Sequence, residues 1–379
     1  MPPFNIQTNQ LRASSIKYRA MTIAYIGLGS NLGDRKGFIH KALKMLAETK
    51  NIKVARVSDL IETAPLGGAN QPKYLNAVAQ IKTALTAENL HKILVNIETS
   101  LGRTRKEKWS SRTIDLDLLL FGEEIINSPD LTIPHPQVHL RSFVLKGLRE
   151  LNRELVHPVL KESIDELALR LNGADFVING EQPQLVSVAG IIGVGKTTLA
   201  KKLSNILDCK CILEAYDKNP YLPDVYAGKK ELALDSQLFF LTSRIEQLHH
   251  NVLAEGQLAI TDYVFNKELV YARRLLNTQQ LALYEKIYPP FAEKVVQPVL
   301  VVYLQDSLEN CLHRIHKRNR PYEQKIELQF LEDLHHDYQQ LFANWKICPV
   351  IRISASKLDY MKDDNIDHLT NQIKSYITV

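Results

Sequence analysis

The sequence lacks the features of a membrane-spanning, secreted or disulfide-bonded protein. No apolar run reaches the roughly 20 residues that a membrane-spanning helix needs. The first 20 residues are polar and have no apolar core, which a secretory signal requires. The 4 cysteines form neither a C-x-x-C pair nor a zinc-binding spacing. We therefore expect free thiols and a cytoplasmic location.

The sequence also lacks a strong charge bias, internal repeats and low-complexity segments. The net charge is +5 over 379 residues, and 45% of the residues are apolar. This mild positive charge suits small anionic substrates as well as nucleic acid, so it does not choose between them. The length predicts two or three soluble domains, each large enough to bury a core.

The first half predicts a ferredoxin-like α+β domain with an antiparallel sheet. An apolar, β-branched run at 22–27 predicts a strand that Gly27, Gly29 and Gly33 then break. Thr86 is positioned to cap a helix at 87–101. The other elements are predicted from apolar spacing as a helix at 36–49, strands at 52–62, 74–83 and 113–121, and helices at 142–151 and 162–171. The resulting order, β-α-β-β-α-β, is typical of this fold.

The second half predicts a doubly wound parallel sheet. A continuous apolar run at 185–189 is typical of a buried parallel strand. Helical stretches, the first at 196–207, separate further strand-like runs at 210–214, 258–262, 299–304 and 349–353. We expect residues 1–20 to be a disordered extension, or Met21 to be the true start. The domains are placed at 21–172 and 185–379, with a linker at 173–184 that is rich in turn residues.

Two aspartates mark a candidate phosphate site in the first half. Asp115 and Asp117 are two apart on a predicted strand, so both point to one face and could hold Mg²⁺. Arg103 and Arg112 precede them, and guanidinium groups suit phosphate oxygens. An acidic pair on a strand is more often a solvated edge. Here the leucines at 116 and 118–120 make the strand apolar. Carboxylates within an apolar strand are costly unless they are paired or bind a metal, which favours the functional interpretation.

A second phosphate signature opens the second half. Residues 190–197 read G-I-I-G-V-G-K-T, which follows an apolar strand and precedes a helix, as in a P-loop. Lys196 would reach the β- and γ-phosphates, and Thr197 would bind Mg²⁺. The P-loop predicts ATP or GTP and leaves the acceptor open. Glu214 follows the next strand and could accept the proton of an attacking hydroxyl.

Residues 22–160 resemble 6-hydroxymethyl-7,8-dihydropterin pyrophosphokinase. The matching pieces are A-Y-I-G-L-G-S-N (24–31), T-A-P-L-G (63–67), Q-P-K-Y-L-N-A (71–77), R-T-I-D-L-D (112–117) and I-P-H-P (133–136). The resemblance implies ATP as donor, two Mg²⁺ ions on Asp115 and Asp117, and phosphates clamped by Arg103 and Arg112. It further implies nucleotide contacts from Arg105, Trp109, His135 and Arg141, and a pterin pocket formed by Thr63, Pro65, Leu66, Tyr74, Asn76 and Phe143.

Residues 185–379 resemble the deoxynucleoside kinases. The resemblance is carried by the P-loop, N-P-Y-L-P-D-V-Y (219–226), D-S-Q-L-F-F-L (235–241) and R-I-H-K-R-N-R-P-Y-E-Q (314–324). It implies Glu214 as general base for the 5′-hydroxyl. Nucleotide contacts are implied for Gly190, Gly193, Gly195, Lys196, Thr197, Thr198, Arg314, Arg318 and Arg320, and nucleoside contacts for Tyr226, Gln237, Asp262 and Glu323. Tyr263 stands where the family often has an arginine.

The leading hypothesis is a bifunctional cytoplasmic kinase that acts on small molecules. The partners expected from it are a pterin, deoxynucleosides and a second copy of the chain bound through the C-terminal domain, with neither nucleic acid nor membrane. One alternative makes the second half a nucleotide-sensing module. Another makes it a nucleoside monophosphate kinase, although residues 212–230 lack the arginines that an acceptor phosphate requires.

Overall fold

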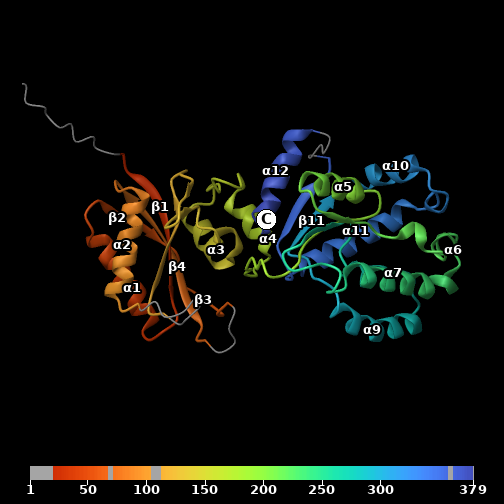
Figure 1. Ribbon diagram of the computed structural model, residues 1–379, viewed down its shortest axis with the longest axis horizontal. Coiled ribbons are helices and arrows are strands. Elements are labelled where there is room, and N and C mark those ends of the chain that lie inside the picture. The colour runs from red at the N-terminus through yellow and green to blue at the C-terminus, as the bar shows by residue number, and fades with distance from the viewer. Residues whose placement is uncertain (1–19, 67–70, 104–111, 357–361, 379) are drawn as a thin grey trace, which may run out of the picture. The chain divides into compact units, whose positions relative to one another are not determined.

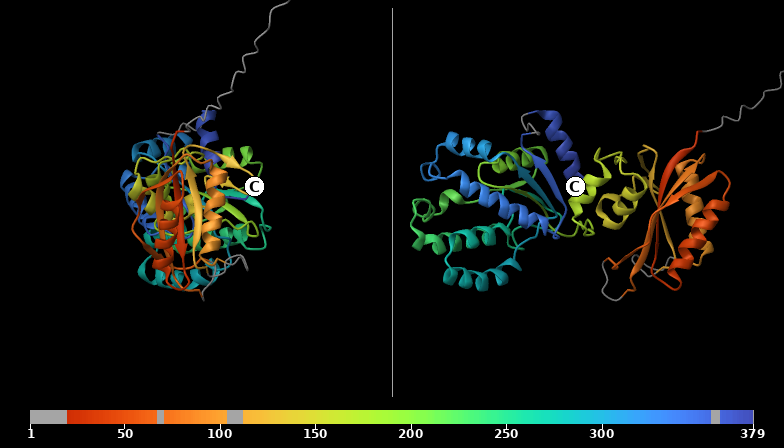
Figure 2. Two further views of the ribbon diagram at one scale, coloured as in Figure 1. Left: turned by 90° about the vertical axis from the view of Figure 1, so that its left-hand side faces the viewer. Right: turned by 180° about the vertical axis from the view of Figure 1, so that it is seen from behind.

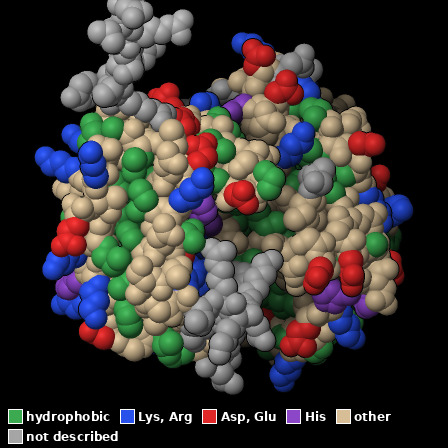
Figure 3. All heavy atoms as spheres, turned by 60° about the vertical axis from the view of Figure 1, so that its left-hand side comes forward, with side chains coloured by type: hydrophobic (Ala, Val, Ile, Leu, Met, Phe, Trp, Pro, Cys, Tyr) green, Lys and Arg blue, Asp and Glu red, His purple; other side chains and the backbone are tan. Residues whose placement is uncertain are grey.

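The computed structural model describes residues 20–66, 71–103, 112–356 and 362–378 (Figure 1). The predicted extension therefore lies outside the described residues except for Ala20. The chain packs into two compact units, Met1–Pro136 and Gln137–Val379. Within the described residues, no helix is both long and apolar enough to cross a membrane. On the face drawn in Figure 3, Lys and Arg side chains are interspersed with Asp and Glu.

The first unit is an antiparallel sheet with two helices on one face (Figures 1 and 2). Its elements are β1 (Thr22–Ser30), α1 (Arg35–Glu48), β2 (Ile52–Val57), β3 (Ile61–Thr63), β4 (Tyr74–Thr83), α2 (Ala87–Ser100), β5 (Asp115–Phe121), β6 (Ile126–Asn127) and β7 (Thr132–Ile133). The strand order is β2-β4-β1-β5, with β3 paired to β4. The predicted antiparallel sheet is confirmed, and the strand predicted at 52–62 is divided into β2 and β3.

Strand β1 is longer than the sequence predicts. It continues through Gly27 and Gly29 to Ser30, because β4 and β5 pair with it on both sides and hold the glycines in extended backbone. A Cβ on Gly29 would lie 3.0 Å from Asn76 Oδ1 and 3.9 Å from Asp115 Cβ. The prediction that Gly27 ends the strand is wrong, and the absent side chain at Gly29 lets neighbouring groups close over the central strand.

Thr86 caps the N-terminus of α2. Its Oγ1 accepts a hydrogen bond from Asn89 N at 3.3 Å, which confirms the predicted start of α2.

Strand β5 turns its leucines toward the helices. Leu116 and Leu118 of β5 are buried in one core with residues of α1 and α2. Since successive side chains of a strand point to opposite faces, Asp115 and Asp117 project from the face away from the helices.

The second unit begins with two helices and continues as a parallel sheet. Its helices are α3 (Ser142–Leu151), α4 (Ile164–Leu171), α5 (Lys196–Ile206), α6 (Leu222–Tyr226), α7 (Ala233–Leu248), α8 (Lys267–Leu275), α9 (Thr278–Ala292), α10 (Leu308–Arg318), α11 (Leu328–Ala343) and α12 (Asp363–Lys374). Its strands are β8 (Gln184–Ala189), β9 (Lys210–Ile212), β10 (Leu258–Thr261), β11 (Leu300–Gln305) and β12 (Val350–Ser354). Short 3-10 turns are η1 (Val138–Leu140), η2 (Tyr216–Lys218), η3 (Lys230–Leu232) and η4 (Pro321–Glu323).

Helices cover both faces of this sheet, whose order is β12-β11-β8-β10-β9. All four pairings are parallel. Leu185 and Ala259 belong to a core with residues of α7, α8 and α9. Their neighbours Val186 and Ile260 belong to a second core with residues of α5, α11 and α12. The predicted doubly wound parallel sheet is therefore confirmed.

The compact units divide at a different place from the predicted linker at 173–184. Asp175 Oδ1 accepts a hydrogen bond from Ser142 Oγ at 2.7 Å, at the start of α3. Phe176 N donates to Leu140 O at 2.9 Å, and the Phe176 ring packs on the core of the second unit. These contacts join α3 and α4 to the parallel sheet, although the turn residues of the stretch favour a boundary there in the sequence.

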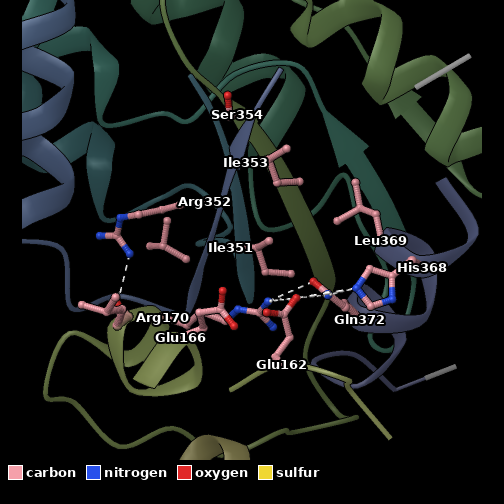
Figure 4. Close-up of a pocket in the computed structure, with 12 residues that line it drawn as sticks. Glu162, Glu166, Arg170, Ile351, Arg352, Ile353, Ser354, His368, Leu369 and Gln372 are labelled. Carbon is pink, nitrogen blue, oxygen red and sulfur yellow. Dashed lines mark hydrogen bonds and ion pairs between the residues drawn. The ribbon is translucent and has the colours of Figure 1, made fainter. Parts of the chain in front are cut away.

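A cavity of about 280 Å³ lies between α4, β12 and α12 (Figure 4). Arg170 Nη2 lies 2.9 Å from Glu162 Oε1 and 3.0 Å from Gln372 Oε1. Arg352 Nη1 donates to Leu169 O at 3.0 Å. The charged groups of the cavity are thus bonded to each other and to backbone. They fasten α4 to β12, an edge strand of the sheet, and to α12.

Candidate active sites

The first candidate site forms around Asp115 on the open face of the antiparallel sheet. Arg103 Nη1 lies 2.6 Å from Asp115 Oδ1, and Arg112 Nη1 lies 2.8 Å from Asp115 Oδ2. The two arginines predicted to clamp phosphates therefore flank the first of the two predicted metal ligands. Because guanidinium groups also pair with phosphate oxygens, this arrangement could exchange a carboxylate partner for a nucleotide.

Two further residues hold the arginines in place. Glu98 is almost fully buried at the end of α2, pairs with Arg103 and accepts a hydrogen bond from Leu116 N at 2.7 Å. Burial raises the pKa of Glu98 to about 7. Asn31 Oδ1 accepts from Arg112 N at 2.8 Å. The sequence analysis missed Asn31, whose signal was its place directly after the first strand.

Asp117 shares its face of β5 with Asp115, and its Oδ1 lies 4.0 Å from His135 Nε2. Desolvation by the surrounding protein, and then the Asp115 charge, raise the pKa of Asp117 to about 6, although 47% of its side chain stays exposed. In the described part of the chain, no three or more His, Cys, Asp or Glu side chains form a cation cage. Two adjacent carboxylates fit a cation that takes its remaining ligands from phosphates and water.

The predicted pterin pocket is partly assembled beside Gly29. Asn76 Nδ2 donates to Thr63 Oγ1 at 2.9 Å, joining β4 to β3. A Cβ on Gly29 would lie 3.8 Å from Tyr74 Cδ1, so the tyrosine ring borders the same space. Pro65 follows β3 and is half-buried, as is the next residue, Leu66.

Four of the predicted ligands of the first site lie either outside the described residues or in the second compact unit. Arg105 and Trp109 lie outside the described residues. Arg141 is buried directly before α3 and hydrogen-bonds Gln137, and Phe143 lies half-buried in the first turn of α3. Both belong to the second compact unit.

The second candidate site begins at the P-loop between β8 and α5. Gly190 has φ +143° and Gly193 has φ +81°, and a Cβ at these positions would meet Leu304 O at 2.6 Å and Cys311 O at 2.4 Å. Only glycine fits either position. Gly195, with φ +104°, then starts α5, whose N-terminus is suited to bind phosphate. The predicted P-loop therefore has the backbone that its sequence requires.

Asp262 links the P-loop to Glu214. Thr197 Oγ1 donates to Asp262 Oδ2 at 2.6 Å, and Glu214 N donates to Asp262 Oδ1 at 2.8 Å. Lys196 Nζ donates to Ile191 O at 2.8 Å within the loop. Because β8, β10 and β9 are adjacent parallel strands, the residues after their carboxyl ends meet at one edge of the sheet. Thr198 lies exposed on α5.

Glu214 lies in a buried group of four charged side chains that the sequence reasoning missed. Lys267 Nζ lies 2.7 Å from each Glu214 carboxylate oxygen. Arg244, from α7, pairs with both Glu214 and Glu268. Burial alone would raise the pKa of Glu214, but Lys267 and Arg244 outweigh it and hold that pKa well below its usual range. The available signals were an arginine within the apolar run of α7 and the pair Lys-Glu at 267–268.

Tyr263, which stands where an arginine was expected, lies in the core. It is fully buried, its hydroxyl donates to Gln247 Oε1 at 2.6 Å, and its ring centroid lies 5.6 Å from the Arg244 guanidinium. Gln247 in turn donates to Leu213 O at 2.9 Å. The tyrosine therefore supports the strand end that carries Glu214.

The predicted lid arginines have partners near the P-loop and near Glu323. Arg314 Nη1 donates to Gly193 O at 3.3 Å and also pairs with Asp306. Arg318 pairs with Glu323, and Arg320 Nη1 lies 3.2 Å from Glu323 Oε1. A further contact was missed by the sequence analysis. The Arg320 guanidinium lies 3.8 Å from the centre of the ring of Tyr216, two residues after Glu214.

Three of the predicted nucleoside ligands, Tyr226, Gln237 and Glu323, lie on α6, α7 and η4. Tyr226 ends α6, and its ring centroid is 6.1 Å from that of Tyr322 beside Glu323. Burial, and then the charges of Glu323 and Glu214, raise the pKa of Tyr226. Gln237 is buried within α7, about two turns before Arg244.

Two families account for the two halves. A family model for 7,8-dihydro-6-hydroxymethylpterin-pyrophosphokinase matches residues 25–153, and one for deoxynucleoside kinase matches residues 186–378. A 2-amino-4-hydroxy-6-hydroxymethyldihydropteridine pyrophosphokinase of Bacillus subtilis is 37% identical over 163 residues, which are 42% of this chain and 98% of that protein. A protein of the same name from Haemophilus influenzae is 41% identical over 159 residues, which are 40% of this chain and 99% of that one.

The second half has its own relative. A deoxyguanosine kinase of Bacillus subtilis is 40% identical over 157 residues, which are 41% of this chain and 76% of that protein. These matches agree with the two candidate sites on two separate sheets. The chain therefore belongs to both families, as a 7,8-dihydro-6-hydroxymethylpterin-pyrophosphokinase followed by a deoxynucleoside kinase.

Proposed function

We propose that each family activity resides in its own charged cluster. The cluster at Asp115 and Asp117 transfers a diphosphate from ATP to 6-hydroxymethyl-7,8-dihydropterin and releases AMP. The cluster at Lys196 and Glu214 transfers one phosphate from ATP to the 5′-hydroxyl of a deoxynucleoside and releases ADP. The observation that carries this proposal is that each sheet presents its own set of cationic side chains beside carboxylates.

In the first site, the chain supplies charge and orientation. Arg103 and Arg112 would leave Asp115 to pair with the phosphates of ATP, and Glu98 would keep Arg103 in position. Asp115 and Asp117 would hold two Mg²⁺ ions, and these would neutralise the charge that develops on the transferred diphosphate. From the family resemblance, we assign Arg105, Trp109, His135 and Arg141 to the binding of ATP.

The pterin would lie against Tyr74, and the family resemblance assigns Phe143 to the same substrate. Asn76 already donates to Thr63, so its amide oxygen is oriented and can accept a hydrogen bond from the edge of a heterocycle. Pro65 and Leu66 would complete the pocket. A flat substrate favours aromatic stacking of this kind.

In the second site, the P-loop would bind the phosphates of ATP and Thr197 would hold Mg²⁺. The backbone N–H groups that start α5 and the Lys196 ammonium neutralise phosphate charge. Glu214 would orient the 5′-hydroxyl and accept its proton as the phosphorus–oxygen bond forms. The phosphate leaves ADP, and the proton stays with the carboxylate until solvent takes it.

The nucleoside would be held by its sugar and its base. Tyr226 and Glu323 would hold the 3′-hydroxyl, and the Gln237 amide would pair with the base. Arg314, Arg318 and Arg320 would close over the phosphates of ATP. Arg318 and Arg320 both contact Glu323, so closure and sugar binding involve the same carboxylate.

A dimer formed through the deoxynucleoside kinase domain is a further proposal, and it rests on the family resemblance. Light scattering coupled to size exclusion would measure it. A mass near twice 43.2 kDa is expected for the full chain, and a mass near 43.2 kDa would overturn it.

Product analysis tests the two activities. The purified chain is incubated with ATP, Mg²⁺ and either the pterin or one of the four deoxynucleosides, and nucleotides are separated by chromatography. We expect AMP with the pterin and ADP with at least one deoxynucleoside. ATP binding without ADP formation for any deoxynucleoside would support the nucleotide-sensing alternative. In a parallel incubation, deoxynucleoside monophosphates replace the deoxynucleosides, and ADP formation with these only would support the monophosphate kinase alternative.

A further inference from the structure

Lys267 is an unusually placed lysine. It is 4% exposed, whereas lysines are almost never fully buried unless paired. It is also the first residue of α8, where the helix dipole disfavours a positive charge. Both features cost free energy of folding, so a specific partner must compensate for them.

That partner is Glu214. The Lys267 Nζ lies 2.7 Å from Oε1 and 2.7 Å from Oε2, so the ammonium group contacts both oxygens of the carboxylate. The Lys267 ammonium also lies 5.2 Å from the centre of the Tyr271 ring, which supports it from its own helix. The bond to Glu214 therefore restricts rotation of the carboxylate group.

The charged side chains around Glu214 indicate that Lys267 is the counter-ion of Glu214. Arg244 is shared, because one of its nitrogens pairs with Glu214 and another with Glu268, which is fully buried. Glu268 also accepts a hydrogen bond from the Tyr284 hydroxyl at 2.5 Å. If Glu268 balances Arg244, Lys267 is the cation in contact with Glu214 that remains to balance it. Loss of Lys267 would leave one uncompensated buried negative charge.

We propose that Lys267 is a positioning residue for phosphoryl transfer at the second site. It holds the Glu214 carboxylate ionised and in one orientation, with Asp262 fixing the backbone of Glu214 from the P-loop side. The residue that follows Asp262 is the buried Tyr263, so the cation beside the base comes from the next helix. This inference rests on the proposed deoxynucleoside kinase activity of the same site.

The test measures deoxynucleoside phosphorylation by Lys267→Met, Lys267→Arg and the exposed-site control Lys286→Met. We expect Lys267→Met to lower kcat at least about 100-fold while KM for the deoxynucleoside changes less than about threefold. Lys267→Arg restores most of kcat because it returns the charge. AMP formation from the pterin by the same preparations serves as the internal control and stays unchanged.

A double-mutant comparison separates positioning from folding. Glu214→Gln and Glu214→Gln/Lys267→Met are compared, and in the second variant the remaining pair of Arg244 and Glu268 stays balanced. If Lys267 acts through Glu214, the two variants phosphorylate deoxynucleosides at rates within about threefold of each other. A further loss as large as that in the single variant would overturn the inference, as would unchanged kcat in Lys267→Met. An inactive wild-type chain would instead overturn the proposed function.

Discussion

We expect two buried histidines of the second unit to make the free energy of unfolding fall in mild acid. His139 Nε2 donates to Ser375 O at 2.8 Å, and His157 Nδ1 accepts from Leu160 N at 3.1 Å and from Val159 N at 3.3 Å. Burial, opposed by the bond to Ser375 and reinforced by Arg170, lowers the pKa of His139 to about 4. Burial, with His139 and Arg170, lowers the pKa of His157 to about 3.

The direction of the effect follows from linkage. Both folded pKa values lie below the ordinary value of about 6.5, so the unfolded chain binds these protons first as the pH falls. The free energy of unfolding therefore decreases below about pH 6.5 and keeps decreasing until the folded pKa values are reached. Between pH 7 and pH 5.5, each histidine should remove about 1 kcal/mol, and the pair about 2 to 3 kcal/mol.

The assay is urea unfolding followed by the fluorescence of Trp345, which is buried in the second unit, in a Trp109→Phe background. The variants are His157→Asn, whose amide oxygen can accept in place of Nδ1, and His139→Gln, whose amide can donate in place of Nε2. Each substitution should remove about one proton from the difference in bound protons between the unfolded and folded chains. The slope of the unfolding free energy against pH then falls by roughly 1.4 kcal/mol per pH unit at full effect. The exposed-site control His313→Asn should keep the wild-type slope.

Absolute stability does not enter this comparison, because only the slope between pH 5 and pH 7 is read. A wild-type slope in both His139→Gln and His157→Asn would refute the reasoning. It would mean that the two imidazoles are protonated equally in the folded and unfolded chains.

Three further outcomes are expected from single substitutions. Gly193→Ala should abolish ADP formation and lower the melting temperature, measured by calorimetry, since its Cβ would meet Cys311 O at 2.4 Å. Glu98→Gln should lower AMP formation at least about tenfold in a product assay, because Arg103 loses a charged partner. Asp262→Asn should lower ADP formation about 100-fold in the same assay and spare AMP formation, because it weakens the link between the P-loop and the general base. Wild-type rates in these variants would contradict the assigned contacts.

Local patterns were sufficient to predict most of the fold. Strand-like runs appeared as strands within a few residues, and Thr86 caps α2 as its side chain suggested. Gly27 and Gly29 misled the prediction, because glycine breaks an isolated strand but not one paired on both sides. The spacing of Asp115 and Asp117 correctly predicted a shared face, since alternation is a local property of strands.

The surroundings of Glu214 could not be predicted, because they depend on contacts between distant residues. Arg244 is 30 positions and Lys267 is 53 positions from Glu214 in sequence. Arg244 lies outside the stretch 212–230, which contains no arginine. The burial of Tyr263 likewise depends on packing against α7 and α9, which no local pattern shows.

The most direct test of two separate kinase sites measures both products in one reaction mixture. Asp117→Asn and Glu214→Gln are each incubated with ATP, Mg²⁺, the pterin and deoxynucleosides, and AMP and ADP are quantified together. We expect Asp117→Asn to lose AMP formation and keep ADP formation, and Glu214→Gln to do the reverse. Loss of both products in either variant would contradict the claim that the chain carries two separate kinase sites.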